Sequence, residues 1–256
     1  MREGDPVRQA GSERKTVIRR AQALLLALGF PLGSSGPNRD GVDGEAGDKT
    51  VSALKAFQTM VGLAPVGAPD GATLSALEEA ATAGRTVRVL AAEAARRGVE
   101  LPIDPRSSRA AFVNAVYYAA LLDEARTGVP AAVTTAQAVL ESNYGQNVPV
   151  DARTGKYSHN LFGIKGWGTM GAVVIWTDEE LGGASVRIEA AFRAYRSFAE
   201  SIADHSALLT GEARYRPLLA GKDPEAWAFG LRRAGYATDS RYAQKLIGIM
   251  RSWGLI

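Results

Sequence analysis

The residue with the clearest potential for chemistry is Glu141, at the end of a predicted helix (PAAVTTAQAVLE) and directly before the string SNYG. A carboxyl group at a helix C-terminus feels the negative end of the helix dipole, which disfavours ionisation. The apolar neighbours Val139 and Leu140 would also desolvate it. Both effects raise the pKa of a glutamic acid. A protonated carboxyl can serve as a general acid that protonates a departing sugar oxygen near neutral pH. A solvated glutamate at a helix end is the alternative for this residue taken alone.

A second segment, SHNLFGIKG (158–166), begins 17 residues after Glu141 and contains groups that suit a sugar ring. Asn160 offers an amide, and Phe162 offers an apolar face. The chain has no cysteine and two histidines, which excludes thiolate chemistry and histidine clusters. We expect His159 to lie in a solvated loop, with a ligand contact as the alternative, and His205 to be structural or solvated. Any chemistry is then carried by carboxylates, hydroxyls, amides or aromatic rings.

The strings ESNYG and SHNLFGIKG, in this order, resemble glycoside hydrolase family 73, the β-N-acetylglucosaminidases of bacterial peptidoglycan. The later strings FRAYRSFAESIADHSALL (192–209) and GYATDSRYAQKLIGIM (235–250) also fit that family. The resemblance implies a lysozyme-like fold and hydrolysis of the β-1,4 bond after N-acetylglucosamine in peptidoglycan glycan strands. It also implies that Glu141 is the general acid.

The resemblance further implies a second carboxylate, which the family carries in a T-x-E-x-x-x-G hairpin. Thr177, Glu179 and Gly183 match that spacing, which makes Glu179 the preferred candidate. Asp178 and Glu180 remain rivals, because the aromatic and asparagine residues usual around this hairpin are replaced here. A solvated acidic turn is the alternative for all three. A long separation from Glu141 would allow inversion, whereas a short one, or the acetamido group of the substrate, would allow a retaining mechanism.

Several aromatic and polar residues of the matching strings are expected to bind substrate. The tyrosines of the string YATDSRY can stack on a sugar or donate a hydrogen bond to a carboxylate, although a core position is the alternative for each. We expect neither a metal nor a cofactor, since no acidic ladder with metal-ligand spacing is present. The predicted substrate-binding residues are Asn160, Phe162, Lys165, Trp167, Tyr236 and Tyr242.

The N-terminal part contains the string DGEAGDKTVSALKAFQ (43–58), which resembles the peptidoglycan-binding domain type 1 family. The match covers about residues 14–80, apart from an expanded loop at 33–40. We expect Asp43, Gly44, Thr50 and Phe57 to build turns and core. No binding residue is assigned in this module, because the ligand contacts of that family lie at poorly specified surface positions.

Helical periodicity dominates the chain and predicts a mainly α fold of the α+β class with one small β-hairpin. We expect a loose tail at 1–13, a three-helix peptidoglycan-binding module at 14–84 and a helix with a linker at 85–107. Residues 108–256 then form the lysozyme-like catalytic domain. Its hairpin is predicted from strands at 172–177 and 185–195, joined by the connection DEELGG.

The net charge of +3 lies in residues 106–256, which hold 17 basic and 14 acidic residues. This mild excess fits loose attraction to an anionic polymer and falls short of a nucleic-acid footprint. No apolar run is long enough to insert into a membrane. The run AQALLLALG (21–29) is interpreted as a helix core rather than a signal peptide. We therefore expect a monomer that is made in the cytoplasm and reaches the periplasmic wall after release through a holin, as for a phage endolysin. A bacterial autolysin is the alternative setting.

Two other functions fit the same elements. A lytic transglycosylase or muramidase could share the fold, but NLFGIK stands where transglycosylases usually carry a G-L-M-Q type string. A non-catalytic wall-binding protein is the other possibility, and the intact motif around Glu141 argues against it.

Overall fold

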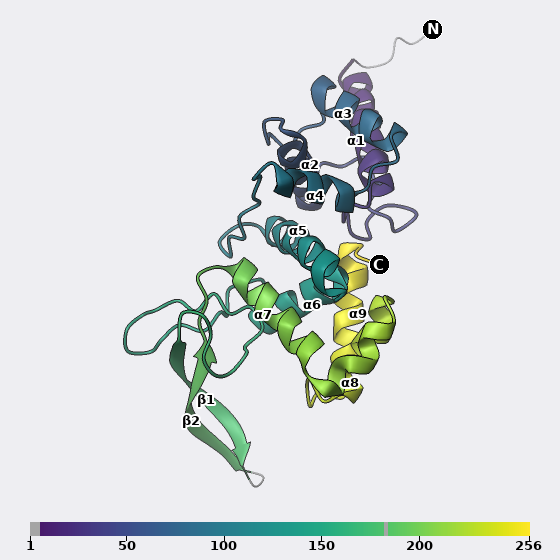
Figure 1. Ribbon diagram of the computed structural model, residues 1–256. Helices are drawn as coiled ribbons and strands as arrows, with labels where there is room; N and C mark the ends of the chain where they lie inside the picture. The colour runs from purple at the N-terminus through teal and green to yellow at the C-terminus, as the bar shows by residue number, and fades with distance from the viewer. Residues whose placement is uncertain (1–5, 182–183) are drawn as a thin grey trace. The chain divides into compact units, whose positions relative to one another are not determined.

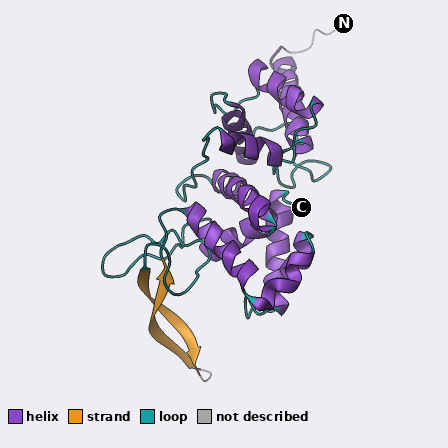
Figure 2. Cartoon of the chain, in the orientation of Figure 1, coloured by secondary structure: helices purple, strands orange, loops and turns teal. Residues whose placement is uncertain are grey.

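The computed structural model describes residues 6–181 and 184–256, and it describes the side chains of 11–176 and 188–256 (Figure 1). The chain forms two compact units. The first comprises Met1–Pro102, Ser107–Leu122 and Gly248–Ile256, and the second Ile103–Arg106 and Asp123–Ile247. Helices prevail throughout the described residues, and one hairpin supplies the strands (Figure 2). The predicted mainly helical fold with a small hairpin is therefore confirmed.

The N-terminal part of the first unit is a cluster of helices: α1 (Pro6–Ala27), α2 (Asp48–Val61), α3 (Gly71–Thr82) and α4 (Val87–Arg96). Helix α1 begins inside the segment 1–13 that was expected to be a tail, because Pro6 is compatible with the first turn of a helix and no second proline follows before its end. Helix α4 packs on α2, so the helical core continues beyond the expected end at residue 84. The largest buried side chains of this core include Leu25, Leu54, Phe57, Leu77 and Leu90.

A buried glutamine, Gln22, holds the loop that carries the DGEAG string. Its Nε2 donates to Asp43 Oδ1 at 2.8 Å and to Thr50 Oγ1 at 3.0 Å. Its Oε1 accepts from the backbone N–H groups of Asp43 and Gly44. Gly44 has a φ of 81°, a backbone conformation that glycine adopts without strain. The string that resembles a wall-binding motif thus builds the fold, as predicted for Asp43, Gly44 and Thr50.

Replacement of Gln22 by leucine is expected to destabilise this module by about 3 kcal/mol, because two backbone donors and two side-chain partners lose a buried hydrogen bond. Hydrogen exchange of residues 14–84 in the full chain, followed by mass spectrometry, would measure the free energy of local opening. Arg20→Gln on the same helix is the matched control, since Arg20 is exposed and pairs with Glu78 at the surface. Equal protection in both variants would contradict the role given to Gln22.

The second unit contains most of the remaining helices, and the boundary between the units falls within α5 and α9. Local signals explain several helix starts: the Ser197 and Asp223 side chains accept hydrogen bonds from the first turns of α7 and α8. Buried residues of this unit include Val133, Leu161, Ile202, Trp227 and Leu231. The second unit contains α6 (Ala131–Ser142), α7 (Phe198–Gly211), the 3₁₀ helix η1 (Ala213–Ala220) and α8 (Pro224–Arg233). Helices α5 (Arg109–Thr127) and α9 (Tyr242–Trp253) each have residues in both units.

The two strands β1 (Ala172–Leu181) and β2 (Ala184–Arg193) form an antiparallel hairpin that extends away from α6, α7 and α8 in Figure 1. Pairing runs without interruption from Ala172 opposite Arg193 to Leu181 opposite Ala184. The connection predicted as DEELGG is therefore too long, because Asp178–Leu181 belong to β1. An antiparallel ladder continues wherever the facing strand can satisfy its backbone donors and acceptors, so the acidic composition of these residues does not end the strand.

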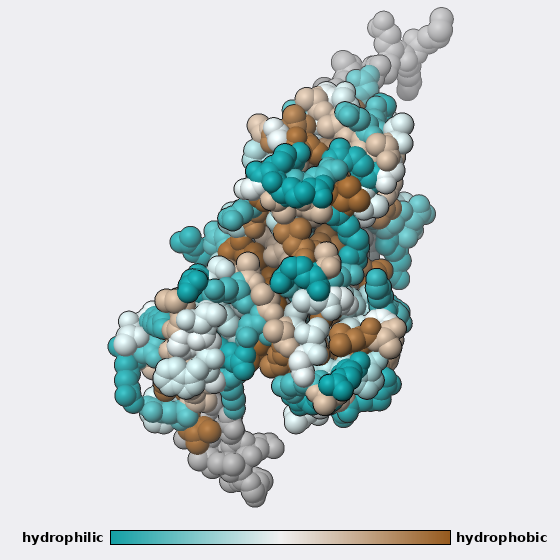
Figure 3. All heavy atoms as spheres, viewed as in Figure 1, coloured by the Kyte–Doolittle hydropathy of each residue, from teal (hydrophilic) through white to brown (hydrophobic). Residues whose placement is uncertain are grey.

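Hydrophilic and hydrophobic residues are interspersed over the visible face in Figure 3. Within residues 6–181 and 184–256, none of the helices combines the length and the apolar character needed to cross a bilayer.

Candidate active site

Helix α6 is buried along most of its length and ends beside a cavity. Glu141, its penultimate residue, is exposed, whereas Ser142 is buried. Asn143, Tyr144 and Gly145 follow with φ values of 47°, 59° and 78°. Asparagine and glycine adopt this left-handed conformation readily, while a tyrosine there is strained. The Ser142 hydroxyl accepts a hydrogen bond from Gly145 N at 2.7 Å and holds the turn. The string ESNYG therefore ends the helix sharply and leaves Glu141 at its tip.

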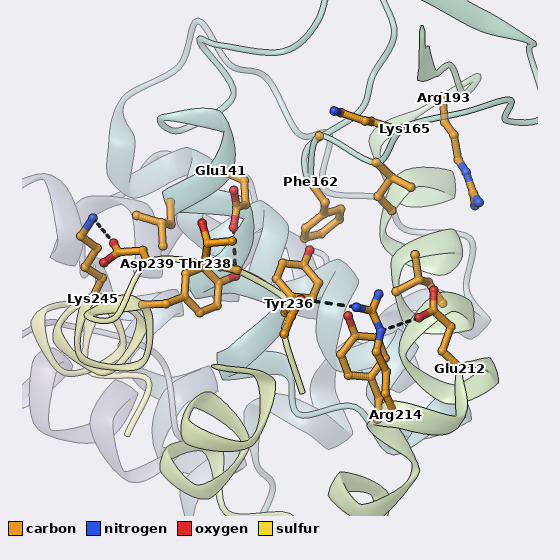
Figure 4. A pocket seen from close by; sticks show the side chains of 18 residues that line it. Glu141, Phe162, Lys165, Arg193, Glu212, Arg214, Tyr236, Thr238, Asp239 and Lys245 are labelled. Carbon is orange, nitrogen blue, oxygen red and sulfur yellow. Dashed lines mark hydrogen bonds and ion pairs between the residues drawn. The ribbon is translucent and has the colours of Figure 1, made fainter. Parts of the chain in front are cut away.

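The cavity has a volume of about 890 Å³ and opens to solvent (Figure 4). In this view Glu141 lies between the Lys245–Asp239 pair on one side and Phe162 and Tyr236 on the other. The cavity is lined by Leu140, Glu141, Phe162, Gly163, Ile164, Lys165, Arg193, Leu208, Glu212, Arg214, Tyr215, Gly235, Tyr236, Ala237, Thr238, Asp239, Tyr242 and Lys245. The four strings of the sequence analysis thus meet around one cavity.

The carboxyl group of Glu141 contacts Tyr242, a tyrosine 101 residues later in the sequence. The Tyr242 hydroxyl donates to Glu141 Oε1 at 2.9 Å. Desolvation by the surrounding cavity wall raises the pKa of Glu141, while the hydrogen bond from Tyr242 and the positive charge of Lys245 oppose that rise. Glu141 is exposed and lines the open cavity, so its carboxyl is partly desolvated yet reachable. These are the conditions for a general acid.

Aromatic rings form the wall next to Glu141. Tyr236 and Tyr242 stack with ring centroids 5.7 Å apart and an interplanar angle of 26°. Phe162 stacks on His205 at 3.9 Å, and His205 meets the edge of Tyr236 at 6.0 Å. His205 is fully buried, and burial lowers its pKa to about 3. The imidazole is therefore neutral near pH 7, which agrees with the structural role expected for this histidine.

Charged residues that the sequence did not single out complete the lining. Lys245 Nζ lies 2.6 Å from Asp239 Oδ2, and Arg214 Nε lies 2.6 Å from Glu212 Oε2. Arg193 Nη1 donates to Asp204 Oδ2 at 2.7 Å. A usable signal existed for Asp239 and Lys245, since both lie inside the string GYATDSRYAQKL. Arg214 carries no such local signal.

Asn160 differs from its predicted role, because its side chain is buried behind the loop. Its Nδ2 donates to Ile164 O at 2.9 Å and to Arg193 O at 3.0 Å. Its Oδ1 accepts from the N–H groups of Phe162 and Ile164. With both amide ends bound to backbone, Asn160 fastens the NLFGIK loop to β2 and does not line the cavity. It presents Phe162 and Lys165, which do line it.

The structure also bears on the predictions for Trp167 and His159 in this segment. Trp167 is 79% exposed and is not among the residues that line the cavity. His159 lies in a loop, as predicted, but it is half-buried and not fully solvated. Its Nδ1 lies 3.1 Å from Tyr195 O, and its ring makes T-shaped contacts with Tyr157 and Phe198, which partly cover it.

The candidates for the second carboxylate, Asp178, Glu179 and Glu180, occupy consecutive positions of β1. Glu179 is paired with Val186 in the register of the hairpin. Their side chains lie outside the described residues, so the assignment among them stays a prediction. Over the part of the chain with described side chains, no group of three potential ligands is arranged to hold a metal ion.

The comparison with known families agrees with this geometry. The model of the glucosaminidase family, described as mannosyl-glycoprotein endo-beta-N-acetylglucosaminidase, matches residues 118–255. The chain belongs to this family, as the resemblance to glycoside hydrolase family 73 predicted. The model of a peptidoglycan binding domain matches residues 14–77, which confirms the second resemblance.

Individual relatives match about half of the chain. The chain is 42% identical over 130 residues to the peptidoglycan hydrolase FlgJ of Pseudomonas aeruginosa. This match covers 49% of this chain and 32% of FlgJ. It is 37% identical over 128 residues to the exo-glucosaminidase LytG of Bacillus subtilis. This match covers 48% of this chain and 44% of LytG. The chain thus spans less than half the length of these relatives. The solved catalytic domain of the autolysin Auto from Listeria monocytogenes superposes on this chain with a TM-score of 0.50 at 29% identity. The superposition covers 57% of this chain and 85% of the solved domain's chain.

Proposed function

We propose that the protein is a peptidoglycan hydrolase that cleaves the β-1,4 bond after N-acetylglucosamine, with Glu141 as general acid. The observation that carries this proposal is the partly desolvated Glu141 carboxyl, held by Tyr242 in an open, tyrosine-lined cavity of a glucosaminidase-family domain. Phe162, Tyr236 and Lys165 contribute apolar faces and a charge to the same cavity. Such a lining suits an amphipathic glycan with carboxylate-bearing substituents.

In the proposed reaction, Glu141 gives its proton to the glycosidic oxygen as the bond between that oxygen and the anomeric carbon of N-acetylglucosamine breaks. The oxygen leaves with the departing sugar, and a water molecule supplies the hydroxyl that ends up on the anomeric carbon. The carboxylate that remains accepts from the Tyr242 hydroxyl and faces the charge of Lys245. Glu179 is proposed as the second carboxylate, with Asp178 and Glu180 as its rivals. Phe162, Lys165, Tyr236 and Tyr242 are the proposed substrate contacts that line the cavity, and Trp167 is proposed as a contact outside it.

Analysis of the products of digested sacculi tests the proposed bond specificity. The proposal predicts soluble fragments with N-acetylglucosamine at the reducing end, identified by mass spectrometry after reduction. Anhydromuramic ends would indicate a lytic transglycosylase, and reducing N-acetylmuramic ends a muramidase. A catalytically silent wall-binding protein would release no soluble fragments.

Removal of residues 1–84 is expected to weaken retention on the wall more than turnover of soluble glycan fragments, because these residues contain the match to the peptidoglycan binding domain. We expect loss of most sedimentation with sacculi and a change of less than about threefold in turnover of soluble fragments, since no residue that lines the cavity is removed. Circular dichroism of the truncated chain must first show a cooperative thermal transition. Undiminished sedimentation would contradict a binding role for the module.

For the biological setting we propose a phage endolysin that reaches the wall through a holin, with a bacterial autolysin as the alternative. The similarity to the autolysin Auto keeps that alternative open. Expression inside a bacterial host separates the two: an endolysin produces lysis only after the inner membrane is permeabilised. Lysis without permeabilisation would favour the autolysin.

A further inference from the structure

A buried glutamine lies behind the tyrosine that contacts Glu141. Gln137 lies one helical turn before Glu141 on α6 and is completely buried. Its Nε2 donates to the Tyr242 hydroxyl oxygen at 3.0 Å, and that hydroxyl donates to Glu141 Oε1 at 2.9 Å (dashed line below Glu141 in Figure 4). Side chains from α6 and α9 thus form a continuous chain of hydrogen bonds that ends on the carboxyl group.

The direction of these hydrogen bonds follows from which of the three side chains can donate and which can accept. A tyrosine hydroxyl has a single hydrogen and can also accept hydrogen bonds. Because the amide nitrogen of Gln137 can only donate, it occupies the accepting side of the Tyr242 oxygen. The hydroxyl hydrogen is then left for Glu141. An acceptor in place of that nitrogen would compete with Glu141 for the same hydrogen.

Stability alone does not explain a glutamine at this position. The other end of its amide, Oε1, is buried without a hydrogen-bond partner among the residues whose side chains are described. A buried polar atom without a partner costs free energy, and an apolar side chain of the same length would avoid that cost. The feature that an apolar residue cannot replace is the donor to Tyr242.

We propose that Gln137 is a positioning residue that orients the Tyr242 hydroxyl toward Glu141, so that the carboxylate left after proton donation is stabilised. The inference rests on the proposed role of Glu141 as general acid. It assigns to Gln137 no contact with substrate, since Gln137 does not line the cavity.

Other charged and titratable groups line the same cavity as Glu141, and a change at Gln137 does not alter their side chains. Lys245 opposes the rise in the pKa of Glu141 and is itself paired with Asp239. The remaining groups lie on the NLFGIK loop, β2, the end of α7, η1 and the connection before α9. They are Lys165, Arg193, Glu212, Arg214, Tyr215 and Tyr236.

The test is the alkaline limb of the pH profile of kcat/KM, measured as release of reducing ends from purified sacculi at limiting substrate. A general acid acts while protonated, so activity falls as the pH rises through the pKa of Glu141. Loss of a donor to the carboxylate raises that pKa and moves the limb to higher pH. We expect a shift of about one pH unit for Tyr242→Phe and about half a unit for Gln137→Met.

The double variant Gln137→Met/Tyr242→Phe separates positioning from a merely structural role. Because Gln137 acts through the hydroxyl, the double variant should show the same limb as Tyr242→Phe alone. Thr135→Val is the matched control: Thr135 is buried on the same helix, and its hydroxyl donates to Ala131 O one turn earlier. The control should leave the limb unmoved. An unshifted limb in Gln137→Met, or additive shifts in the double variant, would overturn the inference.

A second readout does not depend on activity. The carboxyl resonance of Glu141 in carbon-13-labelled protein, identified by its absence in Glu141→Gln, reports the titration of this group directly. It should shift to higher pH in Gln137→Met, and Gln137→Leu gives the same test if the methionine variant does not fold. If Glu141→Gln retains activity, the proposed function fails while this titration still tests Gln137. If Glu141→Gln is inactive and the titration does not move in Gln137→Met, only the inference about Gln137 fails.

Discussion

Glu141→Gln is expected to lower kcat/KM on sacculi by about 10³-fold, within the range that general acid catalysis contributes. The amide has no proton to give at neutral pH, so the departing sugar oxygen must leave without protonation. Glutamine has nearly the same size as glutamate. Its Oε1 can still accept from the Tyr242 hydroxyl, which donates to Glu141 Oε1 at 2.9 Å in the native protein. The variant should therefore fold and bind the wall as the native protein does.

Two controls make the Glu141→Gln result specific. Sedimentation with sacculi and the thermal transition should match the native protein within error. Glu225→Gln removes a carboxylate from the first turn of α8, outside the cavity, and should keep activity within about twofold. Activity of Glu141→Gln above a tenth of the native value would refute the assignment of Glu141 as general acid.

Glu179→Gln is expected to have the second largest effect, a loss of about 10²-fold in kcat/KM, because it removes the proposed base or nucleophile while the proton donor remains. The prediction rests on the T-x-E-x-x-x-G match in a chain that belongs to the glucosaminidase family. Initial rates of reducing-end release would measure it.

Asp178→Asn and Glu180→Gln are the matched comparisons, since both residues flank Glu179 in β1 and lose the same charge. Each should cost less than about fivefold if Glu179 is the second carboxylate. A larger loss in either variant than in Glu179→Gln would transfer the role to that residue. Equal and small losses in all three would show that this strand provides no catalytic carboxylate and would favour the acetamido group of the substrate.

Local signals in the sequence were sufficient for most of the secondary structure. Asp70 caps α3 by accepting from Thr73 N at 2.8 Å, and the string ESNYG ends α6 with Glu141 at its tip. Helical periodicity and capping act over a few residues, which is why a sequence reveals them. The hairpin ran longer than predicted because pairing between strands, and not the composition of Asp178–Leu181, decides where a strand ends.

The sequence alone determined the chemical types at the candidate site: a helix-end glutamate, two tyrosines and a phenylalanine in strings with a family resemblance. The tertiary structure decided what each of them does. Gln137 and Tyr242 are 105 residues apart in sequence, and only packing of α9 against α6 brings the hydroxyl between Gln137 and Glu141. Packing also buries Asn160, which was predicted to contact a sugar, so that its side chain instead links the NLFGIK loop to β2 through Ile164 O and Arg193 O. Contacts between distant segments depend on the whole fold, because hydrogen-bond partners and burial are set by neighbours that no local pattern specifies.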